Sequence, residues 1–232
     1  MLVGQAPGRV FRARQTVIST FLESPVKANP ETKSTESLST KAREYTTLME
    51  AKGGAWWKKA LNVQAPYRWK LRRLNLGFVL DIGCGIGRNL INLRGHGVGI
   101  DHNRYSVERA RSRGLQAFTP EEFKLSEFDA PERFDSILMA HVAEHMMELE
   151  AAGLLRRYLP LLRPQGRTIL ITPQEYGFSS DPTHIQFMTF QNLRAIGDTV
   201  GLELLKEFSF PFPRMFGRVF KYNEFVSVFK KV

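Results

Sequence analysis

Three glycines on alternate positions follow an acid within residues 79–90, VLDIGCGIGRNL. The acid is Asp81, and the glycines are Gly83, Gly85 and Gly87. Glycine tolerates positive φ and has no Cβ that would hold a ligand away from the backbone, so such a turn can lie against a small molecule at the start of a helix. The spacing therefore predicts a ligand-binding loop between a buried strand and the helix that follows it.

A second acid, Asp101, ends the next apolar run, GVGID. An acid at this place binds ribose hydroxyls in more than one cofactor class, so it supports the fold more than the choice of cofactor. The dinucleotide pattern G-x-G-x-x-G needs a small residue at position 88, where this chain has Arg88. Asp81 followed by G-x-G-x-G instead resembles the signature of class I S-adenosylmethionine (SAM) dependent methyltransferases, and this makes SAM the expected cofactor.

The resemblance implies a role for each residue of the loop. Asp81 and the glycine backbone, with Cys84 as a small contact residue, would hold the methionine part of SAM. Asp101 would bind the ribose, and His102 would lie at the edge of the adenine. A reactive thiol role for Cys84 is the less favoured alternative.

Further positions of the family pattern follow the third and fourth strands. Glu121 or Glu122 would meet the adenine amine, with a solvated acidic turn as the alternative. The run FDSILMA resembles the family's fourth motif, which ends facing the transferred methyl group. Ala140 and His141, at the end of this run, would therefore line the pocket.

A candidate general base lies in SSDPTHIQFMTFQNL, which resembles the insert where small-molecule methyltransferases hold a histidine that faces the substrate. His184 can accept a proton near neutral pH, and Asp181 is close enough in sequence to orient it. In the alternative interpretation, His184 only ties the loop to a backbone carbonyl.

The segment HVAEHM also satisfies H-x-x-E-H, an inverted zinc-protease pattern. That pattern belongs on a helix and needs a third ligand, whereas here it begins at a strand end and no third ligand is identifiable. We therefore expect no metal. Glu144 and His145 are instead expected to brace the turn or approach the substrate.

The alternation of apolar runs and amphipathic segments predicts an α/β fold with a doubly wound sheet. The resemblance to the Rossmann-like methyltransferase fold implies seven strands in the order 3-2-1-4-5-7-6, with an antiparallel last strand. The expected strands are 78–82, 98–101, 116–119, 134–140, a fifth after residue 165, 204–210 and 222–229. The expected helices are 88–93, 105–113, 148–162 and 190–200. An acidic loop is expected over 120–133, and no helix between the last two strands.

The basic residues are concentrated ahead of the predicted core. The net charge is +10, but residues 1–76 hold 14 Lys and Arg against 5 Asp and Glu, and the rest of the chain holds 19 against 18. Residues 1–40 are rich in Pro, Ser, Thr and Glu and are expected to be a disordered lead-in. The family resemblance implies that residues 41–76 form a basic, aromatic helical lid on a SAM-binding core at 77–232.

The lid carries nine basic residues together with Tyr45, Trp56, Trp57, Tyr67 and Trp69. Tyr67, Arg68 and Trp69 are expected nearest the cofactor, although the aromatic residues could also dock the helices on the sheet. Basic and aromatic residues together can bind nucleic acid, so an RNA or DNA methyltransferase stays as an alternative, as does a non-catalytic protein of the same fold.

The cysteine content of the chain fits a reducing compartment. Cys84 is the single cysteine, so no intrachain disulfide can form, and no apolar run reaches the length of a membrane span. We expect a cytoplasmic enzyme, with a targeting peptide containing Arg9, Arg12 and Arg14 as the alternative. The predicted activity is methyl transfer from SAM to a small-molecule acceptor, with a hydroxyl oxygen as the favoured acceptor atom.

Overall fold

The computed structural model describes residues 44, 46, 47 and 65–232. Its seven-stranded sheet has the order β3-β2-β1-β4-β5-β7-β6. The strands are β1 (Val79–Ile82), β2 (Gly97–Ile100), β3 (Gln116–Phe118), β4 (Phe134–Ala140), β5 (Leu162–Pro173), β6 (Leu202–Phe210) and β7 (Glu224–Lys231). β7 is antiparallel to both β5 and β6, while the other pairs are parallel. The predicted fold is confirmed.

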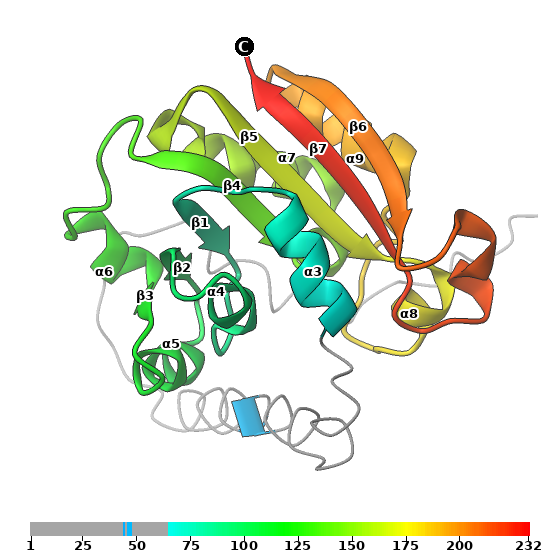
Figure 1. Ribbon diagram of the computed structural model, residues 1–232, viewed down its shortest axis with the longest axis horizontal. Coiled ribbons are helices and arrows are strands. Elements are labelled where there is room, and N and C mark those ends of the chain that lie inside the picture. Colours follow the sequence, from blue (N-terminus) through cyan, green and yellow to red (C-terminus); the bar gives the residue numbers. More distant parts are fainter. Residues whose placement is uncertain (1–43, 45, 48–64) are drawn as a thin grey trace, which may run out of the picture. The chain divides into compact units, whose positions relative to one another are not determined.

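Helices lie on both faces of the sheet (Figure 1). The α-helices are α3 (Ala65–Arg73), α4 (Arg88–Asn92), α5 (Arg104–Arg111), α6 (Pro120–Lys124), α7 (Glu148–Tyr158), α8 (Glu175–Ser179) and α9 (Phe190–Thr199). Three 3₁₀ turns add η2 (Ala143–His145), η3 (Leu159–Leu161) and η4 (Arg214–Arg218). α3 crosses one face over the middle of the sheet, and α7 and α9 cover the opposite face.

The core under α3 fixes that helix over the strands that carry the site. Leu71 and Leu74 are buried in one cluster with Val79 of β1, Leu138 of β4 and Val226 of β7. Removing apolar side chains from water stabilises the fold by roughly 25 cal/mol per Å². α3 therefore shares one core with β1, β4 and β7, which holds its polar residues in fixed places.

Two expectations about loops were wrong. The stretch predicted as an acidic loop begins with α6, because Thr119 and Glu122 form a capping box around Pro120 at the first turn. A 3₁₀ helix also interrupts the connection between the last two strands. It begins after Pro213, whose carbonyl accepts the Phe216 N–H at 3.0 Å.

The ends of several elements differ from the prediction. The helix expected over 148–162 stops at Tyr158, because Pro160 cannot continue its hydrogen bonds and the chain tightens into η3. β7 begins at Glu224 rather than 222. The expected lead-in at 1–40 lies outside the described residues, as do residues 48–64 of the expected lid with Trp56 and Trp57, and Tyr45.

Candidate active site

The glycine loop closes the carboxyl end of β1 against β2. The N–H groups of Gly83 and Cys84 donate to the carbonyl of Ile100 at 2.8 and 3.0 Å, and Gly87 N–H donates to the Cys84 carbonyl at 2.9 Å. Gly83, Gly85 and Gly87 have φ values of 72°, 51° and 80°. These values lie in the left-handed region that disfavours residues with a Cβ, so the spacing of the glycines matches the shape of the turn.

The three glycines differ in what surrounds them. A Cβ at Gly83 would come 2.3 Å from Val142 Cγ2, and one at Gly87 would come 2.2 Å from Leu115 Cδ1. A Cβ at Gly85 would meet no atom within 4 Å. Gly83 and Gly87 are thus required by internal packing, whereas Gly85 leaves open space on the side where a ligand can approach the backbone.

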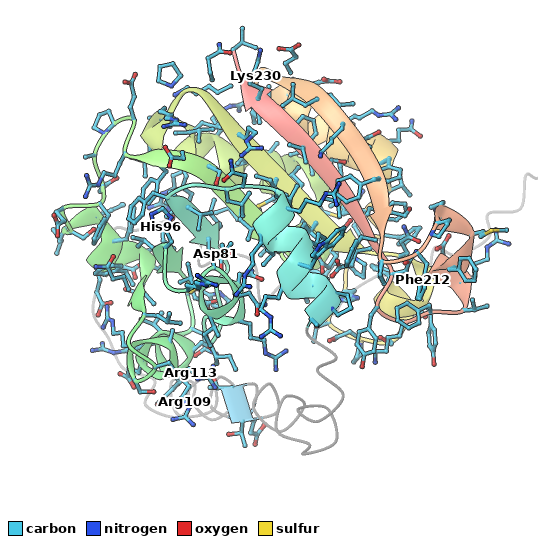
Figure 2. The ribbon with its side chains drawn as sticks, in the orientation of Figure 1. Asp81, His96, Arg109, Arg113, Phe212 and Lys230 are labelled. Carbon is cyan, nitrogen blue, oxygen red and sulfur yellow. The ribbon has the colours of Figure 1, made fainter. Side chains whose placement is uncertain are left out.

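Asp81 is wholly buried at the end of β1 (Figure 2). Its Oδ1 accepts a hydrogen bond from Asn89 Nδ2 at 3.0 Å, and Oδ2 has no hydrogen-bond partner. Burial raises the pKa of Asp81 from 3.8 to about 7. A buried carboxylate oxygen without a donor is costly, and the ammonium of a bound methionine group would satisfy it.

Asn89 is held in turn by α3. The Tyr67 hydroxyl donates to Asn89 Oδ1 at 3.0 Å. Burial raises the pKa of Tyr67 well above its usual range, so the hydroxyl remains a donor. Asn89 is therefore oriented with its amide N–H toward Asp81, an arrangement that the sequence did not reveal.

Asp101 is oriented by backbone N–H groups at the end of β2. Its Oδ2 accepts from Gly85 N–H at 2.7 Å, and its Oδ1 accepts from Asn103 N–H at 2.8 Å. Asn103 also caps α5. His102 is exposed, with Nδ1 3.7 Å from Asp101 Oδ1. The structure thus places Asp101 and His102 beside the glycine loop, and their contacts with ribose and adenine stay predictions.

The remaining cofactor candidates have structural contacts of their own. Glu122 accepts from Arg111 Nη2 at 2.6 Å and caps α6, and the hydrogen bond from Arg111 lowers its pKa. Cys84 is buried, and burial raises the pKa of its thiol, which argues against a reactive role. Ala140 is buried in the core at the end of β4.

Beyond Ala140, a second group of polar residues surrounds His141. His141 Nε2 lies 2.8 Å from Glu224 Oε1, and Nδ1 lies 3.3 Å from Glu144 Oε1. Burial disfavours the charged ring, but these two hydrogen bonds and carboxylate charges prevail and raise the pKa of His141 to about 10. Its φ of 59° is strained for a histidine and aims the ring between the two acids.

Glu224 begins β7 and connects His141 to α3. Lys70 Nζ forms a buried ion pair with Glu224 Oε2 and lies 4.2 Å above the ring of Tyr67. Burial raises the pKa of Glu224, but the charges of Lys70 and His141 outweigh it and hold the pKa below its usual range. Tyr67 and Lys70 are one helical turn apart on α3. Tyr67 is therefore connected to Asp81 through Asn89, and Lys70 is connected to His141 through Glu224.

His184 lies close to Glu144 on the same side of the sheet. Its Nδ1 lies 2.8 Å from the Phe178 carbonyl, its ring stacks on Phe178, and its Nε2 is 4.0 Å from Glu144 Oε1. The Asp181 carboxylate accepts from the N–H and hydroxyl of Thr183 at 3.0 and 2.7 Å. The backbone tie expected as the alternative for His184 is thus present, and Asp181 shapes the loop.

Glu144, His145 and His184 bring one potential ligand atom each within 4.8 Å of one another. His184 is therefore the possible third ligand that the sequence around H-x-x-E-H did not identify. The expectation of no metal stays a prediction, to be checked by chelation.

Comparison with known proteins decides the family. Residues 58–207 match the family model described as a methyltransferase domain. The chain belongs to this methyltransferase family. The predicted family and its cofactor, SAM, are confirmed, and the orphaned Asp81 Oδ2 and the open space at Gly85 fit a bound SAM.

Two curated relatives match part of this methyltransferase. Ubiquinone biosynthesis O-methyltransferases of Bradyrhizobium diazoefficiens and Rhodopseudomonas palustris are 29% and 30% identical to it over 100 residues. The match covers 40% of this chain and 39% of each relative. The chain thus spans about two fifths of the length of these relatives.

Solved structures support the fold. A TehB-like SAM-dependent methyltransferase from Corynebacterium glutamicum superposes with a TM-score of 0.58 at 18% identity, covering 83% of this chain and 99% of that one. A SAM-dependent methyltransferase from Archaeoglobus fulgidus gives 0.54 at 19% identity, covering 71% and 93%. Among the described residues, no helix is long and apolar enough to cross a membrane.

Proposed function

We propose that this methyltransferase transfers the methyl group of SAM to a hydroxyl oxygen of a small-molecule acceptor. The observation that carries the proposal is the hydrogen bond between His184 Nδ1 and the Phe178 carbonyl. A carbonyl only accepts, so in the neutral ring Nδ1 holds the hydrogen and Nε2 keeps a lone pair that can take a proton. The names of the two curated relatives agree with an oxygen acceptor.

SAM supplies a methyl group on a positively charged sulfur, which is displaced in line by the acceptor. Asp81 Oδ2 would bind the ammonium, Asp101 the ribose, and the backbone at Gly85 would lie against the methionine part. The chain then has to align the acceptor, exclude water and remove the hydroxyl proton.

The two histidines divide the acid–base work. His141 lies between two carboxylates, and its pKa of about 10 keeps it protonated and unable to act as the base at neutral pH. His184 Nε2 would take the proton, and Glu144 Oε1, 4.0 Å away, would stabilise the imidazolium that forms. Asp181 would hold the His184 loop through Thr183.

α3 is proposed as the part of the lid that touches both halves of the site. Tyr67 supports Asn89, and Lys70 supports Glu224. Trp69 is more than half exposed and stacks on Phe210 at 6.4 Å. Residues 1–40 as a lead-in and 77–232 as the catalytic core complete the proposed organisation.

A panel of small molecules that carry either hydroxyl or amine groups, incubated with methyl-labelled SAM, tests the function. The informative variant is His184→Asn, because the asparagine amide nitrogen lies where Nδ1 lies in histidine and can still donate to the Phe178 carbonyl, but it cannot take a proton. We expect it to bind SAM normally and to lose turnover on hydroxyl acceptors by about 10²-fold or more at neutral pH. Full activity of His184→Asn, or labelling of amines alone, would refute the proposed reaction.

A further inference from the structure

The connection between β6 and β7 presents large apolar side chains to solvent. Met215, Val219 and Tyr222 are 75%, 70% and 64% exposed, and Phe212 and Phe216 are also exposed. Figure 2 labels Phe212 on the lobe formed by η4 beside α8. We name residues 211–222 the β6–β7 loop. An exposed apolar cluster of this density on one short segment marks an interaction surface.

The loop is held in shape and does not fold its apolar side chains inward. The wholly buried Asn223 accepts from the Phe212 N–H at 2.9 Å and donates to Gln174 Oε1 at 2.8 Å. The Phe212 ring also packs against Phe220 with centroids 5.0 Å apart. The buried Asn223 and the ring contact of Phe212 hold the loop in the shape that leaves Met215 and Val219 exposed.

The charge of the loop is entirely positive. It contains Arg214, Arg218 and Lys221 and no Asp or Glu. Arg214 is paired with Glu175 of α8, whereas Arg218 and Lys221 are exposed beside the apolar side chains. A hollow of about 360 Å³ is lined by Glu175, Arg214, Met215 and Arg218. Cations interleaved with exposed aromatic and apolar groups suit an interface that is anionic at its surface and apolar beneath.

We propose that the β6–β7 loop docks the protein on an anionic lipid bilayer, with Met215 and Val219 entering the headgroup region and Arg218 and Lys221 meeting lipid phosphates. A bilayer satisfies both chemistries at once and requires no matched shape from its partner.

Docking would place the acceptor side of the site at the membrane surface. Tyr222 is two residues before Glu224, which holds His141, and the exposed Tyr176 and Ile185 flank the His184 segment. Under the proposed function, an acceptor with an apolar chain could then enter from the bilayer. The docking itself does not depend on that function.

Vesicle sedimentation of the full-length protein tests the docking. Vesicles of phosphatidylcholine alone are compared with vesicles that also contain phosphatidylglycerol, at low and at high salt. We expect binding to the mixed vesicles, with about a fivefold loss for each cation removed in Arg218→Gln and Lys221→Gln. The double variant Met215→Ser/Val219→Ser should lose about tenfold or more. Leu125→Ser, at a side chain 91% exposed on the C-cap of α6, is the matched control and should bind like the wild type.

SAM affinity, measured on each variant by calorimetry, shows whether it is folded. The proposal is overturned if the wild type binds neither vesicle, or if the loop variants bind as well as Leu125→Ser. It is also overturned if the wild type does not bind vesicles but forms a dimer in size-exclusion chromatography that Met215→Ser/Val219→Ser abolishes. The loop would then join two copies of the chain.

Discussion

Replacing Asp81 by asparagine should abolish SAM binding and yet stabilise the ligand-free protein at alkaline pH. The carboxyl is wholly buried, and burial raises its pKa from 3.8 to about 7. In the pH range between these values the folded state holds a proton that the unfolded state has lost. The free energy of unfolding therefore falls as pH rises through this window. Above about pH 7 this loss of stability, the penalty for ionising the buried carboxyl, is complete.

The size of the penalty follows from the shift. A change of 3.8 to about 7, at 1.36 kcal/mol per unit, corresponds to about 4 kcal/mol. The amide introduced by Asp81→Asn would keep an oxygen that can accept from Asn89 Nδ2 but would carry no charge. We expect Asp81→Asn to be more stable than the wild type by a few kcal/mol at pH 8 without SAM, and no more stable near pH 4.

Urea unfolding of both proteins at several pH values measures this difference, and calorimetry measures SAM binding. Saturating SAM should raise the free energy of unfolding of the wild type but not of the variant, because the SAM ammonium at Asp81 Oδ2 offsets the cost of the buried negative charge. The matched control is Asp101→Asn, which loses charged hydrogen bonds from Gly85 and Asn103 and should be destabilised. If Asp81→Asn shows no pH-dependent gain in stability over the wild type, burial does not raise the pKa of Asp81 and the reasoning is refuted.

Three further results are expected. Gly85→Ala should weaken SAM binding at least tenfold in calorimetry while lowering the free energy of unfolding by only about 1 kcal/mol, because its Cβ enters open space at a φ of 51°; retained affinity would contradict the ligand position. Lys70→Met should cost about 2–4 kcal/mol in urea unfolding, because it leaves Glu224 with His141 as its remaining cation, whereas the exposed Arg73→Met should cost little. Dialysis against EDTA should leave the rate of methyl transfer unchanged, because the proposed reaction uses His184 as its base and needs no metal. A rate that falls and returns with a divalent cation would show that a metal is required.

The sheet could be predicted because its strands are short apolar runs separated by helical segments, and because one glycine loop fixes which strand is first. α6 was missed although Thr119 and Glu122 have the spacing of a capping box. That pattern stood in the sequence, but the acids around it suggested a loop. The capping pattern, and not the acidic composition, decides the structure of this segment.

The partners of the site residues could not be predicted in the same way. Lys70 and Glu224 are 154 residues apart, and only the packing of α3 beside β7 brings them together. An acid at the start of the apolar run EFVSVF is a signal that could have marked Glu224, since a charge entering a buried strand needs a partner. Asn89 carries no such signal, because an asparagine in a short helix can equally well be exposed to solvent and need no buried partner.

The polar defects of the fold favour the same candidate site without reference to any relative. Among the described residues, three buried side-chain oxygens have no hydrogen-bond partner, and two of them are Asp81 Oδ2 and Glu144 Oε2. Asp81 is the last residue but one of β1, and Glu144 lies in η2, just beyond the carboxyl end of the neighbouring parallel strand β4. His141, whose φ is strained, comes directly after β4. Each of these features costs stability. Their concentration at the carboxyl end of the parallel strands is expected where a ligand supplies the missing partners. SAM and its acceptor would satisfy the acids that the chain alone leaves unsatisfied.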